Sequence, residues 1–165
     1  MVRLNISTLN KYKSTLLLIL SLLFCYGVEW SASVFTRSSV GSWYMELEKP
    51  FWNPPNLVFS IVWTVLYTMI GISFWLILCK KKAHTNNVFF AFFQQMFLNF
   101  TWPISFFYFQ SPLLGLINIL LLLYGISWNI YVFFPYSNLA AKLLIPYLLW
   151  VMYATTLNFS IWLMN

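Results

Sequence analysis

Residues 112–134 read PLLGLINILLLLYGISWNIYVFF, a continuous apolar stretch without a single charged side chain. About 20 apolar residues are enough for a helix to cross the hydrocarbon core of a bilayer. A membrane-spanning strand would instead alternate polar and apolar residues over about ten positions. The stretch therefore predicts a transmembrane helix.

Four further stretches have the same character. We place them at about 14–34, 55–79, 88–107 and 139–163. The connections are short, apart from residues 36–54, and leave no room for a domain outside the membrane. The sequence therefore predicts an all-α integral membrane protein in which residues 1–165 form one bundle of five transmembrane helices.

The composition excludes several other classes of protein. Of the 165 residues, 61% are hydrophobic and 7% are charged, against about 25% charged in a typical soluble domain. The net charge is +6, but the basic residues stand at segment ends and form no nucleic-acid-binding stripe. The chain has one histidine and no aspartate, and Cys25 and Cys79 fall within or at the end of apolar stretches. We therefore expect no metal site and no nucleic-acid partner.

The basic residues fall mostly on one side of the predicted membrane. That side carries seven of the nine, namely Arg3, Lys11, Lys13, Lys80, Lys81, Lys82 and Lys142, and the other side carries Arg37 and Lys49. The positive-inside rule then places the N-terminus in the cytoplasm and the first loop outside. The lysine triplet also suits acidic lipids, although topology alone explains it. The N-terminus does not resemble an Arg-rich transit peptide. We therefore favour a bacterial inner membrane over a mitochondrial outer membrane.

Aromatic and amide side chains recur inside the apolar stretches. The second stretch carries Phe59, Trp63, Tyr67, Gly71 and Trp75 at intervals of four, and the fifth carries Tyr147, Trp150, Ala154 and Asn158 along one face. Amides in hydrocarbon must face the bundle interior or a cavity. They either join helices to one another or line a ligand pocket.

The loop at residues 36–54 is rich in large aromatic rings, which predicts a lid over the mouth of the bundle. Asn53 precedes two prolines and is expected to cap the second helix, since proline suits the first helical turn.

Four sequence blocks lead to a family resemblance. They read WYMELEKPFWNPP at 43–55, VWTVLYTMIG at 62–71, LNFTWPISFF at 98–107 and LLIPYLLWVMYATTLNFSIW at 143–162. In this order they resemble the TspO/MBR family from about residue 35 to the C-terminus. The resemblance implies a five-helix bundle, usually a homodimer, with a pocket that opens toward the first loop. Family members bind porphyrins, sterols and synthetic benzodiazepine-type or isoquinoline ligands.

The resemblance also implies which residues bind the ligand. Carried over by position, the pocket consists of Trp63, Tyr67, Asn99, Trp102, Asn118, Trp150, Ala154 and Asn158, with Trp43 and Pro54 in the lid. Asn118 stands where many relatives have Asp, so the pocket is expected to be less acidic. Phe159 and Leu163 replace the Tyr and Arg of the family's sterol motif, which weakens a sterol assignment.

The leading prediction is a membrane protein that binds tetrapyrroles for transport, sensing or disposal, with porphyrin as ligand and no cofactor. One alternative is an enzyme that degrades porphyrin in light, with Trp63 and Trp150 in the oxidative step. Binding is preferred because the sequence offers no general base, nucleophile or metal set. A structural or assembly role without a small ligand is the third possibility.

Overall fold

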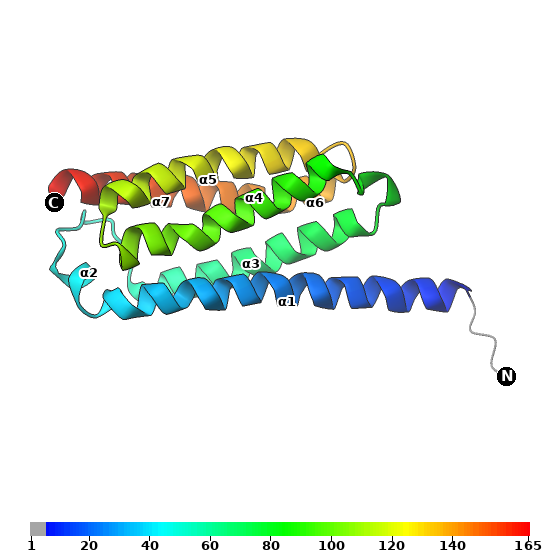
Figure 1. Cartoon of the computed structure of the whole chain (residues 1–165), viewed down its shortest axis with the longest axis horizontal. Helices are drawn as coiled ribbons and strands as arrows, with labels where there is room; N and C mark the ends of the chain where they lie inside the picture. Colours follow the sequence, from blue (N-terminus) through cyan, green and yellow to red (C-terminus); the bar gives the residue numbers. More distant parts are fainter. Residues whose placement is uncertain (1–5) are drawn as a thin grey trace.

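The computed structural model describes residues 6–165 of the chain. Five long helices run side by side in an elongated bundle (Figure 1). They are α1 (Ile6–Val40), α3 (Asn56–Leu78), α4 (Asn86–Pro103), α5 (Pro112–Phe133) and α7 (Ile145–Met164). Shorter helical segments connect them, namely α2 (Trp43–Glu46), η1 (Lys81–Ala83), η2 (Ile104–Tyr108) and α6 (Asn138–Leu143). The predicted all-α class is confirmed for the described residues, which contain no strand.

Four helical stretches are long and apolar enough to cross a membrane. These are Lys11–Val40, Asn56–Leu78, Pro112–Phe133 and Asn138–Met164. Helix α4 is not among them, although it lies within the bundle. It is 18 residues long, and its mean hydropathy is lowered by five amide side chains, namely Asn86, Asn87, Gln94, Gln95 and Asn99. Length and composition therefore support a helical membrane bundle with four candidate spans.

Helix α1 is longer than the predicted 14–34 and extends to Val40. In the added turn, Ser38 donates to the carbonyl of Phe35 at 2.7 Å, and Ser39 donates to the carbonyl of Phe107 in η2 at 2.9 Å. The end of α1 is therefore held both within the helix and by a neighbouring segment. The predicted start of the first loop at residue 36 is therefore wrong, and the connection to α3 begins at Gly41.

The predicted N-cap of the second helix is also wrong. Pro55 occupies the N-cap position of α3, with no side-chain capping bond. Asn53 instead accepts a hydrogen bond from the hydroxyl of Tyr44, at 3.2 Å between Tyr44 Oη and Asn53 Oδ1. The Asn53 side chain therefore bonds to Tyr44, nine residues earlier, and does not cap α3.

The end of α4 departs from α-helical geometry. Pro103 closes the helix and is followed by η2, a five-residue π-helix. Proline has no N–H for the helical ladder, and π segments arise where that ladder is disturbed. Phe106 and Phe107 are both buried although they are adjacent. Helix α5 then begins after Ser111, whose hydroxyl accepts the N–H of Leu114 at 3.3 Å.

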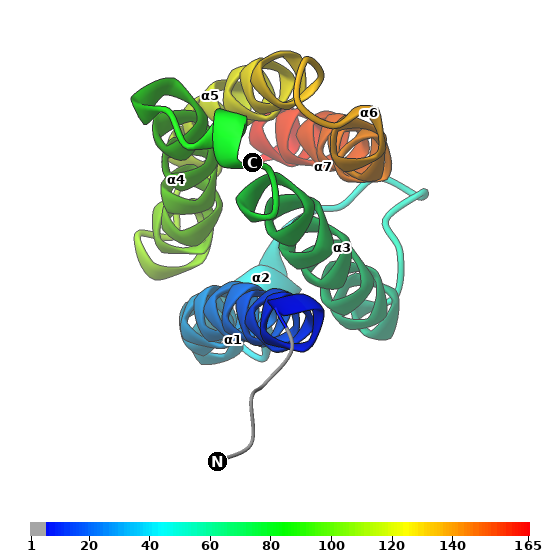
Figure 2. The same ribbon diagram turned by 90° about the vertical axis from the view of Figure 1, so that its right-hand side faces the viewer.

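Viewed along its length, the bundle places α1 at the edge, with α5 and α7 on the far side of α3 and α4 (Figure 2). Helices α1 and α3 approach closely at Gly71. A Cβ added there would meet Leu22 Cδ2 at 2.9 Å, and Ser21 donates to the carbonyl of Gly71 at 2.7 Å. The aromatic stripe on α3 therefore turns around the helix. Gly71 faces α1, whereas Trp63 packs against Tyr147 of α7.

A second close approach gives a test of the packing. A Cβ at Gly115 of α5 would meet Phe106 Cδ2 at 2.7 Å and Asn158 Oδ1 at 2.9 Å. Overpacking of this kind costs about 1–3 kcal/mol. We therefore expect Gly115→Ala to lower the melting temperature followed by circular dichroism in detergent.

Gly27→Ala in α1 is the matched control, because no atom lies within 4 Å of the added Cβ. This variant should melt at or above the wild-type temperature, since alanine favours a helix by up to about 1 kcal/mol over glycine. Equal melting of the two variants would show that the α5 contact is looser than described.

Candidate ligand-binding site

Aromatic rings from α3 and α7 meet in the half of the bundle nearer the lid connection, residues 41–55. Trp63 lies 5.9 Å from Tyr67 and 6.2 Å from Tyr147, measured between ring centroids. One turn nearer the lid, Phe59 lies 5.7 Å from Trp150. These edge and tilted arrangements suit the quadrupoles of aromatic rings. The pairs bring predicted pocket residues Trp63, Tyr67 and Trp150 to one seam between two helices.

A buried hydrogen bond ties this seam to α4. Asn99 Nδ2 donates to the hydroxyl of Tyr147 at 2.8 Å. Tyr147 is fully buried and Asn99 is 4% exposed. A hydrogen bond between helices in an apolar surrounding contributes on the order of 1 kcal/mol. It therefore fixes the rotation of α4 relative to α7.

A second polar contact lies nearer the lid, where three helices meet. Trp102 Nε1 donates to Asn158 Oδ1 at 3.3 Å, and Asn158 Nδ2 donates to the carbonyl of Pro112 at 2.7 Å. The Trp102 ring stacks on Phe106, with centroids 5.4 Å apart. Asn158 thereby joins α7 to α4 and to the first residue of α5. Ala154, one turn earlier on α7, is also buried.

Asn118 lies on the seam between α4 and α5. Its Nδ2 donates to Thr101 Oγ1 at 2.8 Å and to Ser105 Oγ at 3.4 Å. Both partners are on α4 and η2. These contacts join Asn118 to neighbouring hydroxyls rather than to Trp102 or Asn158.

Several buried polar atoms have no hydrogen-bond partner among the described residues. Two belong to predicted pocket residues, namely Trp150 Nε1 and Asn118 Oδ1. The others are both amide atoms of Gln95 and of Asn129, and both of these side chains are fully buried. An unpaired buried donor or acceptor costs about 1–3 kcal/mol. The interior therefore holds unused hydrogen-bonding capacity on α4, α5 and α7.

Two hollows lie in the described part of the structure, and neither lies among the predicted pocket residues. One, of about 370 Å³, is open to the outside between α1 and α4 and is lined by Leu23, Phe24, Gly27, Val28, Ser31 and Phe100. The other, of about 300 Å³, adjoins the lid and is lined by Trp43, Leu47, Trp162, Asn165 and residues 110–113. None of the eight predicted pocket residues lines either hollow. In this conformation those residues contact protein instead.

The connection from Gly41 to Pro55, here called the lid, packs on the end of the bundle. Trp43 lies 5.6 Å from Phe106, and Tyr44 lies 5.5 Å from Phe107. Burial raises the pKa of the Tyr44 phenol, whose hydroxyl donates to Asn53 Oδ1. Because the folded state favours the neutral phenol, the stability linked to Tyr44 is fully present below the pKa of an unfolded tyrosine, about 10. It is lost as the pH rises through the higher pKa of the folded state.

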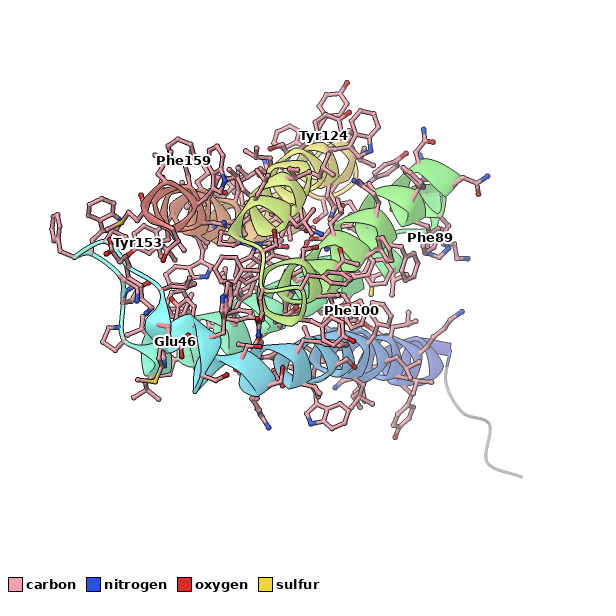
Figure 3. All side chains as sticks on the ribbon, turned by 60° about the vertical axis from the view of Figure 1, so that its left-hand side comes forward. Glu46, Phe89, Phe100, Tyr124, Tyr153 and Phe159 are labelled. Atoms are coloured by element: carbon pink, nitrogen blue, oxygen red, sulfur yellow. The ribbon has the colours of Figure 1, made fainter. Side chains whose placement is uncertain are left out.

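Two sets of hydrogen bonds hold the lid to α7. Tyr153 Oη donates to the carbonyl of Trp52 at 2.7 Å, and Figure 3 shows Tyr153 beside the lid. Asn165 accepts the N–H of Glu48 at 3.0 Å and donates to its carbonyl at 3.1 Å. Pro54 is half-buried, and its carbonyl accepts from Asn53 Nδ2.

Three interior residues take part in or adjoin these contacts without being in the predicted set. Tyr147 shares the face of α7 that carries Trp150, so its spacing in the sequence already indicates an interior position. Gln95 lies one turn from Asn99 on α4, so its position on that face was also visible. Asn129 is an amide within an apolar run, and its complete burial depends on packing that the sequence does not specify.

These features define a helical membrane protein whose apolar interior is organised by amides and indoles beneath a packed lid. The chain belongs to the TspO/MBR family, which matches residues 21–163.

Relatives from distant organisms agree with this assignment. The chain is 40% identical over 148 residues to the tryptophan-rich protein TspO of Archaeoglobus fulgidus, covering 90% of this chain and 96% of the relative. It is 40% identical over 161 residues to the protein of the same name from Chlorobaculum tepidum, covering 95% and 99%. It is 33% identical over 123 residues to the human translocator protein, covering 73% of each.

The lid contacts give a second test. Tyr153→Phe removes the donor to the Trp52 carbonyl and leaves the ring in place. A net hydrogen bond of about 0.5–1.5 kcal/mol corresponds to a roughly 2- to 10-fold faster opening of the lid. We expect that increase in hydrogen–deuterium exchange of peptides covering residues 47–55.

Tyr124→Phe provides the matched control for this experiment. Tyr124 is 66% exposed on α5 and makes no side-chain hydrogen bond within the described part of the chain. Its substitution should leave lid exchange unchanged. Unaltered exchange in Tyr153→Phe would mean that the other lid contacts are enough to keep the lid closed.

Proposed function

We propose that this protein binds a tetrapyrrole among α3, α4, α5 and α7, beneath the lid. The observation that supports it most is the unpaired polar capacity of the interior. Trp150 Nε1 and Asn118 Oδ1 are buried without a partner among the described residues, as are both amide atoms of Gln95. Buried polar groups in native proteins are nearly always paired. A ligand with polar edges would supply partners that the protein does not.

The aromatic side chains favour a flat, ring-shaped ligand. Trp63, Trp102 and Trp150 each pack at the margin of the main apolar core, and aromatic faces stack on planar rings. A porphyrin combines such a face with acidic groups at its edge. Lys49 offers a cation near the mouth of the bundle, where its ammonium lies 4.7 Å from the centre of the Tyr44 ring.

Ligand entry in this proposal requires the lid to move. The predicted pocket residues contact one another and line neither hollow, so a bound macrocycle must displace side chains between α3 and α7. The contacts to be released are those of Tyr153 with Trp52 and of Asn165 with Glu48. This requirement makes lid opening and ligand binding two linked steps.

We also propose that α4 is the fifth membrane span. Its 18 residues continue into the five residues of η2, which gives a helical length of about 34 Å at about 1.5 Å per residue. Gln95 and Asn99 are buried in the bundle, while Phe90, Phe93 and Phe97 are exposed on its outer surface. An apolar outer face with amides inside suits a helix in a bilayer. The charge distribution then supports a cytoplasmic N-terminus.

The binding proposal is tested by quenching of tryptophan fluorescence with protoporphyrin IX in detergent. Trp150→Phe keeps an aromatic ring but removes the unpaired N–H. Loss of one hydrogen bond of about 0.5–1.5 kcal/mol predicts a roughly 2- to 10-fold weaker affinity. Replacing both Trp102 and Trp150 with Leu should weaken binding further.

Trp128→Phe is the matched control, since Trp128 lies on the outer surface of α5 and should not affect affinity. Circular dichroism melting must show that each variant is folded. Wild-type affinity in the folded double variant would place the ligand elsewhere.

A light-driven reaction at the same seam is the second candidate. Trp63 and Trp150 both border the aromatic group around Tyr147, where a bound pigment would lie close to indole rings. Mass spectrometry of the porphyrin after illumination distinguishes the two functions. Recovery of intact porphyrin at stoichiometric protein supports binding alone, and loss that depends on Trp63 and Trp150 supports degradation.

A further inference from the structure

The end of the bundle opposite the lid gathers positive charge from three separate elements. Lys11 and Lys13 come from the start of α1, Lys80 to Lys82 from the end of α3 and η1, and Lys142 from α6. All six side chains are exposed. In Figure 1 these elements lie at the right-hand end of the bundle, and Figure 2 shows α3 between α1 and α6. We call this group the basic corner.

Side-chain contacts hold the elements of the basic corner together. Trp75 Nε1 donates to the carbonyl of Ser14 at 2.9 Å, and Ser14 Oγ lies 3.5 Å from Cys79 Sγ. These contacts place Lys13, in the third turn of α1, beside the end of α3, which Lys80 follows. The basic corner therefore consists of the Lys80–Lys82 run together with lysines that the packing of α1 against α3 brings near it.

Helix α6 is attached to the same end. Ser73 Oγ donates to the carbonyl of Ala140 at 2.8 Å, and both residues are buried. Lys142 follows two residues later and is exposed. A third element therefore adds its cation beside α3.

No acidic side chain balances these six lysines. The chain has three acidic residues, and Glu46 and Glu48 lie in the lid at the opposite end. Glu29 stands 16 residues after Lys13 in α1, which is about 24 Å along the helix. At the lid end, by contrast, Arg37 and Lys49 share the end of the bundle with two glutamates. The positive charge at the basic corner is therefore uncompensated by protein.

The geometry points to a binding surface for anionic phospholipid headgroups at the basic corner. Its cations lie at the ends of apolar helices, where the phosphates of a leaflet are found. Exposed apolar side chains, such as Leu16 and Ile19 of α1, continue from the corner toward the middle of the span and suit acyl chains. The half-buried Trp75 is an aromatic anchor at the same level. This inference does not depend on the proposed tetrapyrrole site.

The inference is tested with the purified full chain in a neutral detergent, where membrane orientation has no influence. Native mass spectrometry measures retention of dioleoylphosphatidylglycerol and dioleoylphosphatidylcholine from an equimolar mixture. We expect the wild type to retain the anionic lipid at least 10-fold more strongly, and less strongly as salt rises. Equal retention of the two lipids would overturn the proposal.

Variants locate the site. A lysine near an anionic lipid surface contributes about fivefold in affinity, so Lys80→Gln/Lys81→Gln/Lys82→Gln should lose most of the preference for the anionic lipid. The corresponding arginine triple variant should retain binding. Lys11→Gln/Lys13→Gln tests the contribution of α1 and should lose part of the preference. Arg37→Gln/Lys49→Gln, at the opposite end, is the matched control and should bind as the wild type does.

Competition identifies the source of the phosphate. Inorganic phosphate or a polyglutamate peptide at the concentration of the lipid should leave lipid retention unchanged. Displacement by inorganic phosphate would indicate a free-anion site, and displacement by the peptide would indicate an acidic protein partner. Either result overturns the lipid assignment, as does unchanged binding in folded variants of both lysine groups.

Discussion

An amide side chain inside an apolar bundle is costly to leave unpaired, and the arrangement of these helices depends on the amide hydrogen bonds that cross between them. Asn99 reaches Tyr147, Asn158 reaches both Trp102 and Pro112, and Asn118 reaches Thr101. Each bond crosses from one helix to another. Apolar contacts alone permit helices to slide or rotate in lipid, since lipid tails offer equivalent surroundings. The amides therefore specify the register that the apolar surfaces leave open.

The same constraint separates what the sequence predicts from what it does not. Continuous apolar runs are enough to locate α3 and α5 to within a residue or so. The predicted helix boundaries are wrong where polar side chains find partners that the local sequence does not suggest. Ser39 near the end of α1 donates to the carbonyl of Phe107, 68 positions away, and Asn53 pairs with Tyr44 instead of capping α3. Those choices depend on three-dimensional neighbours.

The candidate site shows a similar division. Residue types and spacing identify the interior faces that carry Asn99, Trp102, Trp150 and Asn158. Nothing in the spacing indicates that Tyr147 is the partner of Asn99, because that pair is separated by 48 positions in the chain. Nor does spacing predict that Asn118 pairs with hydroxyls of the α4–η2 segment. Pairing depends on the rotation of whole helices, which only the assembled bundle determines.

The π-helix after Pro103 has a consequence for how this chain can change. Its wider turn accommodates one more residue than an α-helix of the same length, and this places neighbouring Phe106 and Phe107 against the same apolar cluster. The carbonyl of Phe107 also accepts a hydrogen bond from Ser39 of α1 at 2.9 Å. Deleting a single residue between 104 and 108 would tighten that turn and rotate everything after it by about 100°, since an α-helix has 3.6 residues per turn. The segment is thus far less tolerant of length variation than the connection at residues 109–111 that follows it.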